Sequence, residues 1–389
     1  MRFLLILKKD GDDLKGEFLS AHNRIKYLKR LFQKTDFVPL LIKEYDGFFL
    51  RLIKRSKRRE KYPAFVYGGI DYRVVWVKSL LMDSLFFRLF RFKPLLLFRL
   101  RLFAKKLSPA DLIISHSFYP GFIARTAFLS QGIHYTVTWH GSDIHSGPRD
   151  SLFARIATRR IIEDASVNYF VSRNLLDSSS YITTSGKKMV LYNGVDESQF
   201  KRYSTEKKQR IRMGLGIHSH FNVAFIGNLY PIKNVMVLPS IFKRMAMAFG
   251  EEIGFHIVGD GFLRNRLEGL FCEQNVTVRF WGNVMPQMIP DIINVMDLIV
   301  LPSKNEGLPL IAVESLACGT PLLGSDVGGI KEVVGEEYVV PLNELFIDSF
   351  VDKAIKILNN RPRVVLNGSF LWDNSAQIEK SSLDSLNIR

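Results

Sequence analysis

The chain has 389 residues, of which 47% are apolar and 24% charged, a composition typical of a folded globular protein rather than of a disordered or fibrous one. At roughly one to two hundred residues per domain, this length predicts about two or three domains. The two cysteines, Cys272 and Cys318, are too few for a disulfide framework and are not spaced as metal ligands, so we expect a reducing, cytoplasmic setting.

The formal charge of +16 is concentrated in the first half of the chain. Residues 1–200 hold 34 Lys and Arg against 18 Asp and Glu, whereas residues 201–389 hold 20 of each. Two basic clusters, 51–61 and 85–106, supply much of the excess, and the second mixes basic with bulky apolar side chains. A solvated helix face and binding to an anionic membrane surface explain this pattern about equally well. Nucleic acid is less favoured, because no recognition module accompanies the clusters.

Short apolar runs alternate with longer segments of helical periodicity, which is the pattern of parallel sheets covered by helices. A polar stretch at 193–209 has the composition of a linker, and a second series of strands follows it. We therefore expect two doubly wound α/β domains. The expected buried strands are residues 3–7, 38–42, 112–115, 135–138, 167–171 and 189–192, then 223–226, 255–258, 276–280, 298–301 and 321–323.

The apolar runs do not predict a membrane-spanning or targeting segment. The run at 3–7 is too short for the core of a signal peptide and is expected to be the first strand. The stretch 85–103 is interrupted by five Lys and Arg residues, so it is expected not to span a bilayer. A helix with one apolar face is predicted over 95–106, which overlaps the end of this stretch.

The most informative segment is 297–333, DLIVLPSKNEGLPLIAVESLACGTPLLGSDVGGIKEV. It predicts a buried strand, a loop with Glu306, a helix with Pro309 at its first position, and a strand followed by two glycines. Glu314 then lies about a turn and a half inside the helix. The unpaired N–H groups at the start of this helix favour an anion, so a nucleoside diphosphate is expected at 307–310 while the two carboxylates accept sugar and ribose hydroxyls.

The motif P-S-x-x-E-G-x-P-x-x-x-x-E-x-x-A-C-G-T-P, followed by a strand and G-G, resembles the nucleotide-sugar site of family 4 of the retaining glycosyltransferases. Members of that family have the two-domain GT-B fold. The resemblance implies that Glu306 contacts the transferred sugar and Glu314 the ribose of the donor. It places Gly307, Leu308 and Pro309 beside the donor diphosphate.

Other segments extend the resemblance over nearly the whole chain. FIGNLYPIK at 225–233 is similar to the diphosphate-binding turn, where Lys233 would neutralise the leaving phosphate and Gly227 would allow close backbone approach. Asn228 stands where many members have an arginine, and it lacks that residue's charge. Two further loops resemble those that contact the donor base, with Gly259 and Asp260 in IVGDG and Gly282 and Val284 in FWGNV.

In the first half, TWHGSD at 138–143 follows a predicted strand, and His140 matches the family histidine beside the donor sugar. Taken alone, such a histidine more often makes only local hydrogen bonds. The resemblance places Asp143, Gly11 and Gly16 on the acceptor side. The loop at 8–16 lacks the Gly-Gly pair common in the family.

The resemblance implies an acceptor-binding Rossmann-like domain at 1–197, a nucleotide-sugar-binding Rossmann-like domain at 198–370, and a helix at 371–389 that crosses back to the first domain. The active site is expected in the cleft between the domains. The implied reaction transfers a sugar, with retention, from a nucleoside diphosphate donor, UDP-sugar being favoured, to an acceptor hydroxyl. No metal or other cofactor is expected, because Lys233 and helix amides would stabilise the leaving group.

The basic, apolar first half favours a lipid-linked glycan acceptor at the inner face of the cell membrane, as in bacterial cell-surface polysaccharide biosynthesis. Three alternatives stay open. They are another GT-B nucleotide-sugar enzyme such as an epimerase or hydrolase, a non-catalytic donor-binding partner of another transferase, and a basic module that binds nucleic acid. Product analysis separates the first, and binding without turnover identifies the second.

Overall fold

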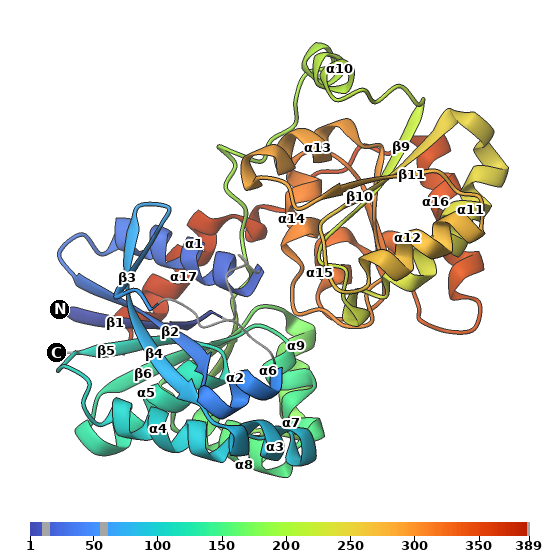
Figure 1. Cartoon of the computed structure of the whole chain (residues 1–389). Helices are drawn as coiled ribbons and strands as arrows, with labels where there is room; N and C mark the ends of the chain where they lie inside the picture. The colour runs from blue at the N-terminus through green and yellow to red at the C-terminus, as the bar shows by residue number, and fades with distance from the viewer. Residues whose placement is uncertain (10–15, 55–60, 387–389) are drawn as a thin grey trace. The chain divides into compact units, whose positions relative to one another are not determined.

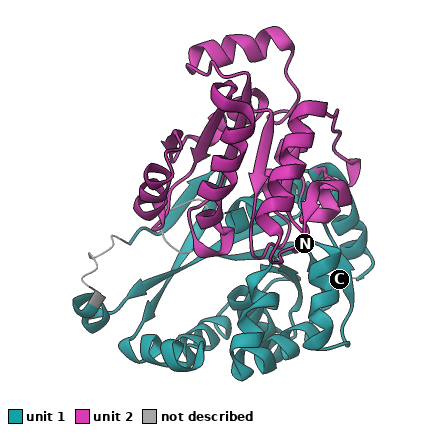
Figure 2. Ribbon diagram, turned by 90° about the vertical axis from the view of Figure 1, so that its right-hand side faces the viewer, with its two compact units in different colours: residues 1–193, 372–389 teal, residues 194–371 magenta. Residues whose placement is uncertain are grey.

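The structure is a computed structural model that describes residues 1–9, 16–54 and 61–386 (Figure 1). The chain divides into two compact units, one made of Met1–Asn193 with Trp372–Arg389 and the other of Gly194–Leu371 (Figure 2). Each unit holds one sheet with helices on both faces, so the expected α/β class is confirmed. Within the described ranges, every helix is too short or too polar to cross a lipid bilayer.

The sheet of the first unit has eight strands in the order β3-β4-β2-β1-β5-β6-β7-β8. Neighbours pair in parallel, except that β3 and β4 form an antiparallel hairpin at one edge. Strands β2, β4 and β3 lie on one side of β1, and β5 to β8 lie on the other side. Such a reversal of strand order opens a crevice at the carboxyl ends of the two central strands, here β1 and β5. The strands are β1 Arg2–Lys8, β2 Asp36–Asp46, β3 Ala64–Tyr67, β4 Ile70–Ser79, β5 Leu112–His116, β6 His134–Trp139, β7 Val167–Phe170 and β8 Lys188–Val190.

Helices cover both faces of this sheet, which is why the central β1 is a continuous apolar run rather than an alternating one. The last helix of the chain, α17, packs on α1 within this unit. The pair buries an ion pair, Arg24 with Glu379, whose nearest charged atoms are 3.7 Å apart. The helices are α1 Gly16–Leu31, α2 Phe48–Lys54, α3 Leu81–Phe90, α4 Pro94–Ala104, α5 Phe118–Gln131, α6 Ser142–His145, α7 Gly147–Asp150, α8 Leu152–Asp164, α9 Arg173–Ser178, η1 Ser179–Tyr181 and α17 Trp372–Asp384.

The sheet of the second unit is fully parallel, with the order β11-β10-β9-β12-β13-β14. Its strand order reverses between β9 and β12, so these two strands flank the crevice of this unit. Both strands are buried along their whole length. The strands are β9 Phe221–Ile226, β10 Ile253–Val258, β11 Val278–Gly282, β12 Leu298–Leu301, β13 Leu322–Ser325 and β14 Val339–Val340.

The helices of the second unit lie on both faces of its sheet (Figure 1). The α-helices are α10 Thr205–Gly214, α11 Leu238–Phe249, α12 Arg264–Glu273, α13 Ile289–Val295, α14 Leu310–Ala317, α15 Ile330–Val334 and α16 Phe346–Asn360. Single 3₁₀ turns occur at η2 Pro231–Lys233, η3 Val235–Val237, η4 Gly250–Glu252, η5 Pro286–Met288, η6 Glu336–Tyr338 and η7 Gly368–Phe370.

The chain enters and leaves the second unit at adjacent points. Val195 N donates to Phe370 O at 3.0 Å, and Val195 forms a parallel bridge with Leu371. The second unit is therefore an insertion into the first, and its two ends are hydrogen-bonded to each other.

The expected strands all occur, with ends shifted by up to two residues except at β2, which continues four residues beyond its expected end. Two expectations were wrong in detail, and three strands were not expected. The end of the polar stretch 193–209 is helical, because Ser204 caps α10 by accepting from Lys207 N. The helix expected at 95–106 ends at Ala104. The hairpin β3–β4 and the short strand β14 were not expected.

Candidate functional site

Two charged side chains meet at the carboxyl edge of the second sheet. Lys233 follows β9 and Glu306 follows β12, the strands between which the order reverses. Lys233 Nζ lies 2.6 Å from Glu306 Oε1, and Ser303 Oγ donates to the same oxygen at 2.6 Å. Lys304 N donates to Ile232 O at 2.8 Å and so ties the two loops together. Both charged side chains stay partly exposed, at 22% and 10%, so a ligand can reach the pair.

Glycines allow the loops at this edge to approach one another. Gly328 has φ +55°, and a Cβ there would lie 1.9 Å from the carbonyl oxygen of Glu306. Gly259 has φ +120°, and its Cβ would lie 2.2 Å from the carbonyl oxygen of Gly227. Gly259 N in turn donates to Gly282 O at 2.8 Å. Because side chains cannot fit at Gly259 and Gly328, these positions require glycine.

The remaining residues expected near the base lie on the loops after β9, β10 and β11. Asp260 Oδ1 accepts from Gly261 N at 2.7 Å, and its other oxygen lies 3.3 Å from Arg264. This carboxylate therefore already stabilises its own turn. Asn228 is exposed, and Val284 is half-buried.

Helix α14 begins one residue later than expected. Pro309 has an extended ψ of 121° and its carbonyl accepts from Ala312 N, so it is the N-cap rather than the first helical residue. Glu314 consequently lies about one turn inside the helix. Gly307 and Leu308, which precede the cap, are buried, and Gly307 O accepts from Gly329 N at 2.8 Å.

Glu314 is the second carboxylate of the predicted donor site. It is half-buried, and within the described part of the chain its carboxylate accepts no hydrogen bond. Burial without a partner raises its pKa to about 7. An uncompensated carboxylate of this kind is suited to accept hydrogen bonds from ligand hydroxyls.

In the first unit, His140 pairs with a second histidine. His116 ends β5 and His140 follows the neighbouring β6, and Nδ1 of His116 lies 3.1 Å from Nε2 of His140. Burial, with a further contribution from the charge of Arg24, lowers the pKa of His140 to about 3. Burial also lowers the pKa of His116. Both rings are therefore neutral at pH 7, and the N–H group of one donates a hydrogen bond to the unprotonated nitrogen of the other.

His116 was missed by the sequence reasoning. The sequence did carry a signal, because His116 directly follows the predicted strand 112–115, and the next predicted strand along the chain, 135–138, leads to His140. Asp143 accepts from Gly141 N at 2.9 Å and from His140 N at 3.4 Å, and burial raises its pKa to about 6. Gly16 is the exposed first residue of α1, and Gly11 lies outside the described residues.

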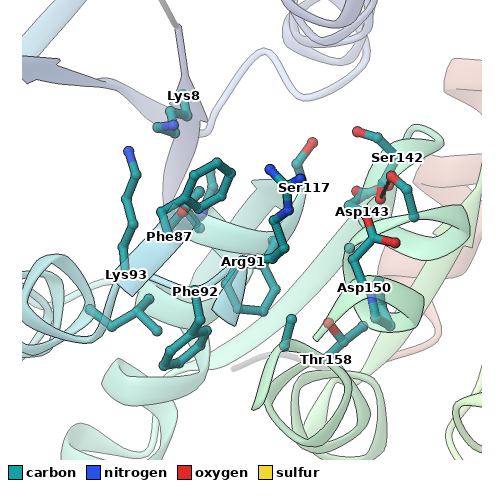
Figure 3. Close-up of a pocket in the computed structure, with 18 of the residues that line it drawn as sticks. Lys8, Phe87, Arg91, Phe92, Lys93, Ser117, Ser142, Asp143, Asp150 and Thr158 are labelled. Carbon is teal, nitrogen blue, oxygen red and sulfur yellow. Dashed lines mark hydrogen bonds between the residues drawn. The ribbon is translucent and has the colours of Figure 1, made fainter. Parts of the chain in front are cut away.

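A cavity of about 380 Å³ opens in the first unit and was not anticipated. It is lined by residues that follow β1 and β5, the two strands at which the order of this sheet reverses. Figure 3 shows Lys8 and Lys93 on one side, Asp143 and Asp150 on the other, and Arg91 between them. Asp143 thus lines a cavity while its carboxylate holds the turn that bears His140.

Comparison with known proteins assigns the family. A family model described as "Glycosyltransferase Family 4" matches residues 50–199, and one described as "Glycosyl transferases group 1" matches residues 220–360. Together they cover most of both units. The chain belongs to the family 4 glycosyltransferases. The resemblance deduced from the Glu306 to Glu314 motif is confirmed.

Curated glycosyltransferases are similar in sequence. A putative teichuronic acid biosynthesis glycosyltransferase, TuaC of Bacillus subtilis, is 30% identical over 228 residues, which cover 58% of this chain and 56% of that protein. The UDP-Gal:alpha-D-GlcNAc-diphosphoundecaprenol alpha-1,3-galactosyltransferase of Escherichia coli is 29% identical over 276 residues, 64% of this chain and 67% of that protein. The chain thus spans little more than half the length of TuaC.

Solved structures share the fold over the full length. Sucrose-phosphate synthase of Thermosynechococcus elongatus superposes with a TM-score of 0.77 at 16% identity, covering 99% of this chain and 98% of that one. HepE of Anabaena, in complex with UDP-glucose, gives 0.66 at 17% identity, covering 100% and 97%. These glycosyltransferase structures confirm the expected GT-B fold.

Proposed function

We propose that this protein transfers a sugar from a UDP-sugar to an acceptor hydroxyl, with retention at the anomeric carbon. The observation that carries the proposal is the partly exposed Lys233–Glu306 pair at the reversal of strand order in the second unit. The names of similar proteins support the choice of base, since the Escherichia coli relative uses UDP-Gal and HepE was solved with UDP-glucose.

In this proposal Lys233 supplies positive charge to the donor diphosphate and stabilises the charge that develops on the departing phosphate. The first N–H groups of α14 face the same region and add the positive end of a helix dipole. Glu306, released from Lys233 by the incoming phosphate, accepts sugar hydroxyls. Glu314 accepts ribose hydroxyls, because its carboxylate has no hydrogen-bond partner in the described chain.

The route to retention follows from which groups are already engaged. Glu306 Oε1 accepts from Ser303, and in the donor complex proposed above the same carboxylate also accepts from sugar hydroxyls, which makes it a poor nucleophile. We therefore favour attack by the acceptor hydroxyl on the face from which the diphosphate leaves, with the departing phosphate taking the proton. Metal-free stabilisation of the leaving group by Lys233 is part of the proposal.

The acceptor is proposed to be a lipid-linked glycan at the inner face of the cell membrane. Helix α2 exposes Phe49 and Ile53 at 69% and 66%, and α3 exposes Leu89 at 65%. Exposed apolar groups on a basic unit fit a peripheral membrane surface, where each nearby cation contributes about 1 kcal/mol on anionic lipid. The acceptor named for the Escherichia coli relative, a diphosphoundecaprenol-linked sugar, and the teichuronic acid role named for TuaC agree with cell-surface polysaccharide synthesis.

Thermal denaturation with UDP, GDP, ADP and CMP tests the donor site, because a ligand that binds only the folded state raises Tm. We expect UDP to raise Tm of the wild type and not of Lys233→Ala. The matched control is Lys243→Ala, which removes an exposed lysine from α11. Equal shifts by UDP in both variants, or no shift by any nucleotide, would refute the assignment of Lys233. NMR of the product then separates retaining transfer from epimerisation or hydrolysis.

Flotation with anionic and neutral liposomes tests the membrane proposal. We expect binding to anionic liposomes that weakens at high salt. A double variant, Phe49→Ser with Ile53→Ser, should reduce flotation and leave the effect of UDP on Tm unchanged. Failure of the wild type to float with either liposome at moderate salt would remove the argument for a membrane surface.

A further inference from the structure

The cavity of the first unit lies where open parallel sheets bind their ligands. Its lining includes Lys9 after β1 and Ser117 after β5, so it occupies the reversal of strand order. The connection between α3 and α4 and the turn between α6 and α7 complete its walls. None of the residues proposed to bind the donor nucleotide lines it.

We propose that this cavity binds the diphosphate ester that links the acceptor sugar to its lipid. Arg91 and Lys93 hold the phosphates, Asp143 and Asp150 accept hydroxyls of the sugar, and the hydrocarbon leaves past Phe87. The inference rests on the proposed function, since it names the chemistry and the orientation of the acceptor.

Arg91 is the principal cation of the site. Within the described residues no carboxylate pairs with its guanidinium, whose central carbon lies 5.9 Å from the Phe87 ring centroid. Its backbone has φ +52° at the end of α3, a position where helices usually place glycine or asparagine. An arginine that bears this unfavourable conformation brings a forked donor to the cavity, and that fork matches phosphate oxygens.

A second lining residue is also held in a rare backbone conformation. Ser117 has φ +70° and ψ 179°, a region almost confined to glycine. Its hydroxyl donates to Glu17, another lining residue, instead of capping α5. Residues in rare conformations cluster at ligand sites because the surrounding structure must hold them there. The rare backbone conformations of Arg91 and Ser117 therefore indicate a ligand site at this cavity, and this evidence is independent of the charges that line it.

The basic wall continues beyond Arg91. Lys93 Nζ lies 2.5 Å from Glu44 and Lys8 Nζ lies 3.7 Å from the same carboxylate. The ring of Phe87 lies between the cations, 5.6 Å from Lys93 Nζ. An anion that enters on this side meets Arg91 together with two lysines that share one carboxylate.

The opposite wall and the rim fix the orientation of the ligand. Asp143 and Asp150 face the cations across the cavity (Figure 3), and carboxylates are suited to accept sugar hydroxyls but repel phosphate. Asp143 also accepts a hydrogen bond from the backbone N–H of His140. On the side of the cations, Phe92 stacks on Phe153 with ring centroids 5.6 Å apart. The apolar surface that begins there continues along the exposed α3, which gives a lipid tail an exit.

The test uses calorimetric titration of the full-length protein with farnesyl diphosphate, farnesol and inorganic diphosphate, each with the donor site saturated by UDP. We expect farnesyl diphosphate to bind at least tenfold more tightly than either of the others. Tight binding of inorganic diphosphate alone would mean a site for free phosphate, and tight binding of farnesol alone a purely apolar site. Either result would overturn the proposal.

Three variants assign the contacts. Arg91→Ala, which keeps a Cβ at the same backbone angle, should weaken farnesyl diphosphate about tenfold or more, whereas the control Arg88→Ala on the same helix should change it less than about twofold. Phe87→Ala should weaken farnesyl diphosphate and leave inorganic diphosphate unchanged. Equal affinity for wild type and Arg91→Ala, with UDP still raising Tm, overturns this inference alone. If UDP raises the Tm of neither the wild type nor any variant, the proposed function itself is refuted.

Discussion

Donor binding should depend on pH through Glu314. Its carboxylate accepts no hydrogen bond in the described chain, and burial raises its pKa to about 7. In the proposed function ribose hydroxyls donate to the ionised carboxylate, so binding of the donor should require Glu314 to lose its proton. Cys318, one turn further along α14, does not titrate in the relevant range, because burial raises its pKa to about 12.

The magnitude follows from the ionised fraction. For a pKa near 7, that fraction is about 0.9 at pH 8 and about 0.03 at pH 5.5. Affinity should therefore fall about 30-fold between these values, which corresponds to about 2 kcal/mol of binding free energy. UDP-glucose is the suitable probe, because each of its phosphates stays singly ionised over this range.

Calorimetric titration of UDP-glucose at several pH values measures this dependence. Glu314→Gln is the matched control, since its amide oxygen accepts hydroxyls at every pH. We expect this variant to bind more weakly than the wild type at pH 8 and to show little change down to pH 5.5. A wild type without the loss at low pH, or a variant with the same loss, would refute the role given to Glu314.

Four further outcomes are expected. Glu314→Gln should raise the free energy of unfolding of the unliganded protein at pH 8 by roughly 1–2 kcal/mol and leave it unchanged below pH 4.5, as urea denaturation at both pH values will measure. The pKa of Glu314 is about 7 in the folded state and lower in the unfolded state, so the wild type loses stability as the pH rises between these two values. The full loss would be about 3 kcal/mol, and partial exposure of the carboxylate reduces it. Lys233→Met should lower kcat for transfer about 10²- to 10³-fold, which steady-state kinetics will show and an unchanged kcat would contradict. Gly328→Ala should lower the free energy of unfolding by about 2 kcal/mol or more and abolish UDP binding, whereas Gly269→Ala, in open space on α12, should be neutral or stabilising by up to about 1 kcal/mol; equal effects in chemical denaturation would contradict this. His116→Leu should lower kcat about tenfold with UDP affinity unchanged, while His116→Asn, whose amide can replace Nδ1, should retain most activity; similar kinetics for both would remove the positioning role.

The parts of the fold that sequence reasoning found are those buried on both faces. Strands such as β1, β9 and β12 are continuous apolar runs, so they are visible without any partner. The hairpin β3–β4 was not predicted because β4 alternates buried and exposed residues and so lacks the continuous apolar run that marks the other strands. A signal was present in Gly68 and Gly69, which join Tyr67 to Ile70 and both have positive φ.

The donor site and the cavity differ in what the sequence reveals. Glu306 and Glu314 stand in one motif of fixed spacing and Lys233 in a second motif, and each motif follows a predicted strand, so the sequence placed them at one edge of a sheet. The cavity could not be predicted in this way. Arg91 has a left-handed backbone conformation that the sequence does not mark with a glycine, and the other lining residues are distant in sequence. The pairing of His116 with His140 likewise depends on β5 lying beside β6, which apolar periodicity does not specify.

The adjoining ends of the second unit bear on its autonomy. Because Val195 and Phe370 are hydrogen-bonded, residues 194–371 form a segment whose termini already meet. Excision leaves no long loop to close and separates neither Lys233 nor Glu314 from the other residues of the proposed nucleotide site. The same geometry suits circular permutation, with new termini placed elsewhere in this segment. Under the proposed function, donor recognition is thus encoded in a transplantable module, which a different acceptor unit can carry between two short connections.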